Sequence, residues 1–226
     1  MVSGLFTGVL PCADCPGILT HVTFDKNGQV AITSLYEDRG NFPGTETGTW
    51  KFDKGLIRIG LSSSDSVFYL VKSDSVIAMV NRQGKEVDSA LRKNYLLTKQ
   101  PETDAKAFEG EYWLGGNDEK TKGYRQKMVV KKLSDKEAEV TISFMGAQKG
   151  CTFTGKGKVI NDQIEIPLDK VNPDFKSVMV VRFMKNHQLA VTTSREDTLT
   201  DLAYFCGGGA SLAGEYEKAN DTKSGK

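Results

Sequence analysis

Two cysteines near the start of the chain are spaced so that both sulfur atoms can act on one target. Cys12 and Cys15 are separated by two residues, with Pro11 before them and Pro16 after them. Such a Cys-x-x-Cys pair can be a thioredoxin-like redox site or supply two ligands to zinc. It can also bind soft Cu(I) through two thiolates, or close a small structural or redox-sensing disulfide.

The residues around this pair weigh against two of the four possibilities. A thioredoxin-like site needs a helix to follow the first cysteine, whereas Pro16 and Gly17 lead into strand-like sequence. Structural zinc needs four ligands, and the nearest further candidate, His21, alternates with the apolar residues of its strand. A Cu(I) site at Cys12 and Cys15 and a reducible disulfide between them both stay open.

The two remaining cysteines, Cys151 and Cys206, are 55 residues apart in the second half of the chain. One disulfide per half is the simplest pairing, because it requires no contact between the halves. A closed loop of this length stabilises a fold by about 4 kcal/mol in the chain-entropy model. Four cysteines that can be paired in this way favour an oxidising compartment, either the bacterial envelope or the exterior.

Motifs for enzyme catalysis are missing from the sequence. His21 and His187 are the only histidines, and there is no Gly-x-Ser-x-Gly elbow, phosphate-binding loop or His-Glu-x-x-His motif. We therefore expect a protein that is not an enzyme. The net charge of +1 gives no general attraction to nucleic acid, and we expect no nucleic-acid partner. No stretch of about 18 apolar residues occurs.

Alternation of apolar and polar residues dominates the chain and predicts short β-strands. Asn27-Gly28 predicts a hairpin with a type I′ turn. Ser194 resembles the N-cap of a two-turn helix that ends at Ala203. The fold class predicted is all-β, with two small antiparallel β-barrels in tandem. Strands are expected at 4–10, 18–24, 30–36, 46–52, 56–61, 67–71, 76–80 and 95–98, then at 108–114, 127–133, 138–145, 151–158, 163–168, 177–184, 188–193 and 212–217.

A polar segment that contains a proline separates the two strand series and predicts a linker at residues 100–107. The expected domains are a barrel with the Cys-x-x-Cys pair at 1–99 and a second barrel with a disulfide at 108–218. A disordered tail is expected at 219–226.

The first of these domains resembles the N-terminal domain of the NlpE family over about residues 4–98. The resemblance rests on the string Cys12-Ala13-Asp14-Cys15-Pro16-Gly17-Ile18, with Phe6–Leu10, Glu46–Trp50 and Asn94–Leu97 in family-like order. It implies a lipocalin-like barrel of about eight strands in an envelope lipoprotein. Family members can carry a second barrel, of the oligonucleotide/oligosaccharide-binding type, with its own disulfide, a role that would suit Cys151 and Cys206.

Membership of this family further implies a function in copper resistance and envelope-stress signalling. The protein would be attached to the outer membrane by a lipidated N-terminal cysteine outside this chain, would face the periplasm, and would act on an envelope signalling protein. Copper association would map onto Cys12 and Cys15. We expect a monomer or a domain-swapped dimer.

Two other functions remain as alternatives. A lipocalin-like barrel can carry a small apolar ligand, unless its interior is filled by side chains such as Phe24, Tyr36, Trp50 and Phe68. The second domain could instead serve as a surface adhesion or partner-docking module.

Overall fold

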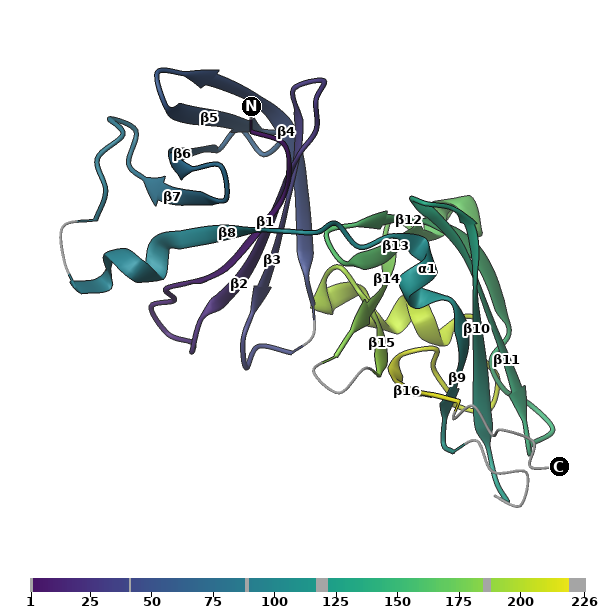
Figure 1. Ribbon diagram of the computed structural model, residues 1–226. Helices are drawn as coiled ribbons and strands as arrows, with labels where there is room; N and C mark the ends of the chain where they lie inside the picture. The colour runs from purple at the N-terminus through teal and green to yellow at the C-terminus, as the bar shows by residue number, and fades with distance from the viewer. Residues whose placement is uncertain (1, 41, 88–89, 117–121, 185–187, 220–226) are drawn as a thin grey trace, which may run out of the picture. The chain divides into compact units, whose positions relative to one another are not determined.

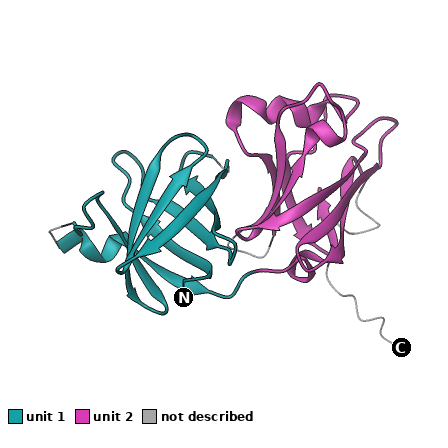
Figure 2. Cartoon of the chain, turned by 90° about the horizontal axis from the view of Figure 1, so that it is seen from above, with its two compact units in different colours: residues 1–102 teal, residues 103–226 magenta. Residues whose placement is uncertain are grey.

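The computed structural model describes residues 2–40, 42–87, 90–116, 122–184 and 188–219. The chain divides into two units, residues 1–102 and residues 103–226 (Figure 2). Each unit is a closed barrel of eight antiparallel strands (Figure 1), so the expected all-β fold with two barrels in tandem is confirmed.

In the first unit, every strand pairs with the next one along the chain, and β1 pairs with β8 to close the barrel. Leu5 lies opposite Gln100 in the closing pair. The strands are β1 (Gly4–Leu10), β2 (Ile18–Phe24), β3 (Gln29–Tyr36), β4 (Gly44–Asp53), β5 (Leu56–Leu61), β6 (Ser66–Ser73), β7 (Val76–Val80) and β8 (Leu96–Gln100), with a 3₁₀ helix at Ala90–Tyr95 before β8.

Apolar side chains fill the interior of the first barrel, because alternate residues of each strand point inward. Phe24 packs edge-to-face against Phe6, and its ring centroid lies 5.3 Å from that of Trp50. Of the four side chains considered as a possible filling of the barrel, Tyr36 and Phe68 lie outside it. Tyr36 is 43% exposed at the end of β3, and Phe68 points outward between the inward-facing Val67 and Tyr69.

The second unit has the same strand order, with β9 and β16 closing the barrel. This is an eight-stranded up-and-down meander. An oligonucleotide/oligosaccharide-binding barrel has five strands in a Greek key, so that subtype does not describe it. The strands are β9 (Gly110–Leu114), β10 (Arg125–Ser134), β11 (Glu137–Met145), β12 (Phe153–Ile160), β13 (Gln163–Pro167), β14 (Val178–Phe183), β15 (Leu189–Thr193) and β16 (Gly214–Lys218), with 3₁₀ helices at Leu168–Lys170 and Glu196–Ala203.

The boundary between the units falls inside the segment predicted as a linker. The end of this segment belongs to helix α1 (Ala105–Phe108), whose N-cap Asp104 accepts hydrogen bonds from the amides of Lys106 and Ala107. Ala105 and Phe108 are buried in the core of the second unit. The predicted tail lies outside the described residues, apart from Ala219.

Two local predictions are wrong in detail. The hairpin between β2 and β3 forms, but only Gly28 in its turn has a positive φ, whereas a type I′ turn needs two such residues. The Asp25 carboxylate organises the turn instead, because it accepts hydrogen bonds from the amides of Asn27 and Gln29. Near the other expected helix, Arg195 and not Ser194 is the cap, and the helix is of the 3₁₀ type.

Across the described residues, no helix has the length and apolar character needed to cross a membrane.

Candidate redox and metal site

The Cys-x-x-Cys pair lies in the loop that joins β1 to β2. Cys12 and Cys15 form a disulfide, with their Cα atoms 5.3 Å apart. Both cysteines are partly exposed, and Ala13 and Asp14 between them are exposed. Solvent, a thiol reductant or a metal donor can therefore approach the loop.

Glycine is needed where this loop rejoins the barrel. A Cβ atom on Gly17 would lie 2.4 Å from Cγ1 of Val9, which is closer than real contacts allow. The Gly17 carbonyl accepts hydrogen bonds from the amide of Glu37, on the neighbouring loop, and lies 3.3 Å from Sγ of Cys15. The loop is thus held at its C-terminal side by the residue that follows β3.

A second connection runs from the side of the loop to the segment after β3. The guanidinium of Arg39 donates a hydrogen bond to the Asp14 carboxylate and lies 5.8 Å from the centre of the Tyr36 ring. The other carboxylate oxygen of Asp14 is 3.5 Å from Sγ of Cys12. Asp14 and Arg39 did not emerge as functional residues from the sequence, although Asp14 stands inside the family-like string.

Three potential metal ligands come together in this loop. One ligand atom each from Cys12, Asp14 and Cys15 lies within 4.8 Å of the others. His21, the residue considered as an additional zinc ligand, lies on β2 and does not belong to this group. In the bonded form neither sulfur is a thiolate, so the pair can offer soft ligands to a metal only after the disulfide is reduced.

The second disulfide joins the loop before β12 to the loop before β16. Cys151 and Cys206 have Cα atoms 3.9 Å apart, and Cys151 is fully buried. Backbone hydrogen bonds flank the bond on both sides, from Thr152 N to Phe205 O and from Gly207 N to Gly150 O. This disulfide is therefore part of a packed junction, unlike the bond at Cys12 and Cys15.

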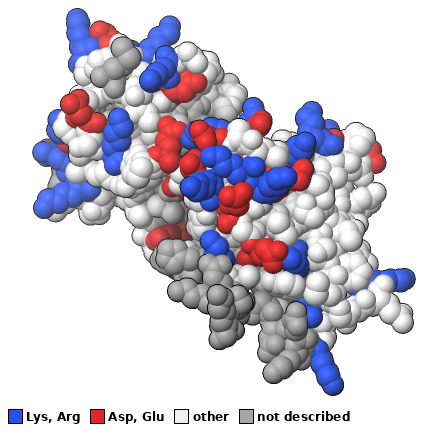
Figure 3. All heavy atoms as spheres, turned by 45° about the vertical axis from the view of Figure 1, so that its right-hand side comes forward, with Lys and Arg blue, Asp and Glu red and all other residues white. Residues whose placement is uncertain are grey.

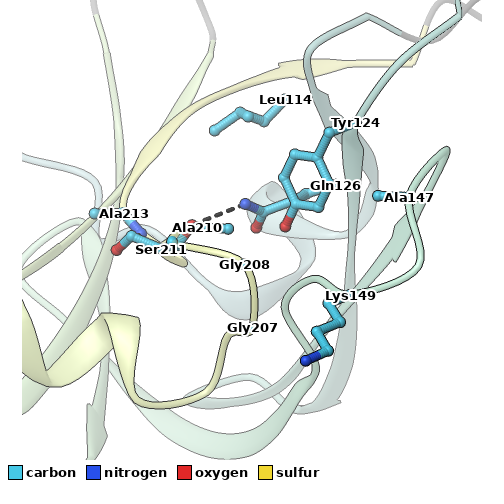
Figure 4. Close-up of a pocket in the computed structure, with 11 residues that line it drawn as sticks. Leu114, Tyr124, Gln126, Ala147, Lys149, Gly207, Gly208, Ala210, Ser211 and Ala213 are labelled. Atoms are coloured by element: carbon cyan, nitrogen blue, oxygen red, sulfur yellow. Dashed lines mark hydrogen bonds between the residues drawn. The ribbon is translucent and has the colours of Figure 1, made fainter.

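A pocket of about 480 Å³ lies beside this junction (Figure 4). Its walls include the loop at Gly207–Ser211 and the side chains of Tyr124 and Lys149. The Gln126 amide donates to the Ser211 carbonyl at 2.8 Å and accepts from the Tyr216 hydroxyl at 2.6 Å. The amide of Gln126, which lines the pocket, is thus already bonded within the protein.

Carboxylates with altered acidity belong to ion pairs in this structure. Hydrogen bonds from Lys72, Lys132 and Arg195 lower the pKa values of their respective partners, Glu86, Asp135 and Asp197. Each lowered pKa is explained by the ion pair in which the carboxylate takes part. None of these shifts indicates a general acid or base. His187 lies outside the described residues.

The unit that carries the Cys-x-x-Cys loop is similar to a known protein family. Residues 6–90 match the family model described as the NlpE N-terminal domain. The first unit thus matches the NlpE N-terminal domain. The matched segment begins within β1 and contains the loop with Cys12 and Cys15 and the strands from β2 to β7.

Two curated relatives of the NlpE domain are lipoproteins. The 17 kDa lipoprotein of Treponema pallidum is 36% identical over 84 residues, which cover 32% of this chain and 54% of the relative. Lipoprotein NlpE of Escherichia coli is 32% identical over 92 residues, which cover 40% of this chain and 38% of the relative. The chain thus matches about half or less of the length of these relatives.

Two solved structures show weaker similarity. A Shewanella oneidensis lipoprotein is 28% identical, with a TM-score of 0.38, and the match covers 43% of this chain and 88% of that one. The Escherichia coli NlpE structure, described as that of the Cpx pathway activator, is 17% identical, with a TM-score of 0.35, and the match covers 85% of this chain and 84% of that one.

Proposed function

We propose that this protein is a non-enzymatic bacterial envelope lipoprotein that takes part in copper homeostasis and in sensing surface or redox stress. The observation that carries the proposal is a partly exposed Cys12–Cys15 disulfide within a unit that matches the NlpE N-terminal domain. The curated relatives are lipoproteins, which supports attachment through an N-terminal lipid. The proposal places this anchor in the outer membrane, with the protein facing the periplasm. The role named for the Escherichia coli protein supports an envelope signalling partner.

The chemistry of this loop links redox state to metal binding. Two electrons and two protons from a thiol reductant convert the Cys12–Cys15 disulfide into two thiols, while the reductant is oxidised to its own disulfide. Cu(I) then displaces the two protons and binds two thiolates, because soft ligands select a soft ion. One loop can therefore exist in an oxidised metal-free form and a reduced form that can hold copper.

Anaerobic Cu(I) titration of the reduced full chain, against a competing Cu(I) chelator of known affinity, tests the metal branch. The double variant C12S/C15S should lose Cu(I) affinity by at least about 100-fold, because hydroxyls are poor ligands for a soft ion. The matched control C151S/C206S also lacks two sulfur atoms and should keep the affinity of the wild type. Equal affinity in C12S/C15S and the wild type would refute copper binding at this loop.

The redox branch depends on how readily each disulfide is reduced. In glutathione buffers of graded potential, alkylation and mass spectrometry should show that Cys12–Cys15 opens at a less reducing potential than Cys151–Cys206, since it is more accessible. A Cys12–Cys15 bond that never forms, or that stays intact across the range of potentials found in the envelope, would argue against redox sensing.

The alternative function as a carrier receives no support from the first barrel. Its interior holds the side chains of Phe6, Phe24, Ile57, Tyr69 and Leu97, which occupy the space an apolar ligand would need. Soaking the protein with a fluorescent fatty acid should leave the fluorescence of the probe unchanged.

A further inference from the structure

A second pocket lies on the outside of the first barrel, away from the thiol chemistry proposed above. Its volume is about 550 Å³, and it opens on the outer face of β4, β5 and β6. The charged side chains among its lining residues are all basic. The lining residues are Thr49, Lys51, Arg58, Ile59, Gly60, Ser66, Phe68 and Arg82.

Strand register places two of these cations directly opposite each other. Lys51 on β4 faces Arg58 on β5, and Arg58 in turn faces Phe68 on β6. Like charges at directly opposed positions destabilise an antiparallel pair. Arg82 lies two residues after the end of β7 and adds a third positive charge to the lining.

The second barrel shows the usual arrangement of charges for comparison. On β11 and β12, Glu137 faces Lys158 and Glu139 faces Lys156. Basic and acidic side chains are also interspersed on the face of the molecule shown in Figure 3. The pocket differs from this arrangement, because all three charged side chains that line it are basic.

No described residue neutralises these three cations. Within the ranges that the structure describes, Lys51, Arg58 and Arg82 take part in no ion pair or side-chain hydrogen bond. The acidic residues closest in sequence are Asp53, Asp65 and Glu86, and none of them lines the pocket. Glu86 is paired with Lys72 and Arg92. All three cations are exposed, so an anion from solution can reach them.

We propose that this pocket binds a phosphate-bearing ligand. The planar guanidinium groups of Arg58 and Arg82 can each donate two parallel hydrogen bonds to phosphate oxygens, and Lys51 adds a compact third charge. Phe68 offers an apolar surface beside them, suited to the carbon skeleton that carries the phosphate. The phosphate belongs either to a soluble phosphorylated molecule or to a phospholipid headgroup.

The test uses the full chain with two probes, inorganic pyrophosphate and vesicles. ¹H–¹⁵N NMR titration with pyrophosphate should move the amide signals of Arg58, Gly60 and Phe68, and R58Q/R82Q should weaken binding about tenfold or more. The control K93Q/K176Q removes the same charge at two exposed lysines outside the pocket and should bind as the wild type does. Thermal melts should show that both variants are folded.

The vesicle arm separates the two sources of phosphate. Flotation with vesicles of phosphatidylethanolamine and phosphatidylglycerol, compared with phosphatidylcholine vesicles, should show binding that R58Q/R82Q abolishes if the ligand is a headgroup. If the ligand is soluble, pyrophosphate binds and neither kind of vesicle does. If neither probe binds, or if both double variants weaken binding equally, the proposal is wrong. These outcomes do not depend on Cys12 or Cys15, so they leave the proposed function untouched.

Discussion

The guanidinium of Arg39 is hydrogen-bonded to the carboxylate of Asp14, which joins the Cys-x-x-Cys loop to a segment 25 residues further along the chain. Both side chains are largely exposed, at 48% and 69%. Exposed ion pairs contribute about 1 kcal/mol or less to stability. The pair therefore matters for the position and charge of the loop more than for the stability of the barrel.

The first prediction concerns which atoms of the loop hold copper. Asp14→Asn should change the Cu(I) affinity of the reduced protein by less than about threefold, because a hard carboxylate that already accepts from Arg39 is a poor ligand for Cu(I). Cys12→Ser should lower the affinity by at least about 100-fold. Chelator competition measures both. A loss in Asp14→Asn as large as that in Cys12→Ser would make Asp14 a ligand.

The two disulfides should differ in their contribution to stability. Removing the 55-residue crosslink with C151A/C206A should lower the free energy of unfolding of the second unit by up to about 4 kcal/mol, because the unfolded chain regains the entropy of the open loop. C12A/C15A opens a ring with a sequence separation of only three and should cost the first unit about 2 kcal/mol or less.

Each unit holds one tryptophan, so the two transitions can be followed separately. Urea unfolding in a Trp50→Phe background reports on Trp113 in the second unit, and a Trp113→Phe background reports on the first. Similar losses of stability for both disulfide variants would contradict the chain-entropy account.

Buried tyrosines should make the protein sensitive to alkali. Burial raises the pKa values of Tyr69 and Tyr216 above the ordinary tyrosine value near 10. A raised pKa in the folded state means that the unfolded chain ionises first, so stability is complete below about pH 10 and falls as the pH rises further.

Tyr216→Phe isolates this effect. At neutral pH it should cost about 1–2 kcal/mol, since Gln126 loses the hydroxyl hydrogen bond at 2.6 Å. Between about pH 9 and about pH 11 the variant should lose less stability than the wild type. Tyr204→Phe, at a 65% exposed position, is the control and should follow the wild-type curve. Identical pH profiles for all three proteins would show that the pKa of Tyr216 does not differ between the folded and the unfolded chain.

Two glycines on the paired strands β4 and β5 should differ in how they tolerate substitution by alanine. A Cβ atom on Gly48 would lie 2.2 Å from the carbonyl oxygen of Gly60, so Gly48→Ala forces β4 and β5 apart and should cost about 2 kcal/mol or more. A Cβ atom on Gly60 would meet nothing within 4 Å. Gly60→Ala should therefore be tolerated, and thermal melts of the two variants provide the comparison.

Much of the strand pattern could be predicted, because one face of each strand is buried and the residues alternate accordingly. The run Ile18–Phe24 is an example: Thr20, Val22 and Phe24 are buried, as alternation requires. Phe68 shows the limit of this argument. It is apolar but outward, and only the burial of its neighbour Tyr69 reveals which face of the strand points to the core.

The contacts that build the sites depend on register and on loops, neither of which is visible in local sequence. Nothing near Asp14 indicates that Arg39 binds it, because the two loops meet only when β2 and β3 have paired. The opposition of Lys51 and Arg58 likewise requires the β4–β5 register. Cys12 and Cys15, by contrast, stand out because a single loop contains both.

The meander order of both barrels has a consequence for how the chain acquires its structure. All but one of the strand pairs in each unit join consecutive strands, so they can form as hairpins while the chain is still being completed. The closing pair of each barrel is different, because it joins the first strand to the last. Leu5 can pair only once Gln100 is present, and Trp113 only once Glu217 is present. Until then each unit is an open sheet with two unpaired edges, the stage at which the chain is most prone to aggregate and most open to chaperones.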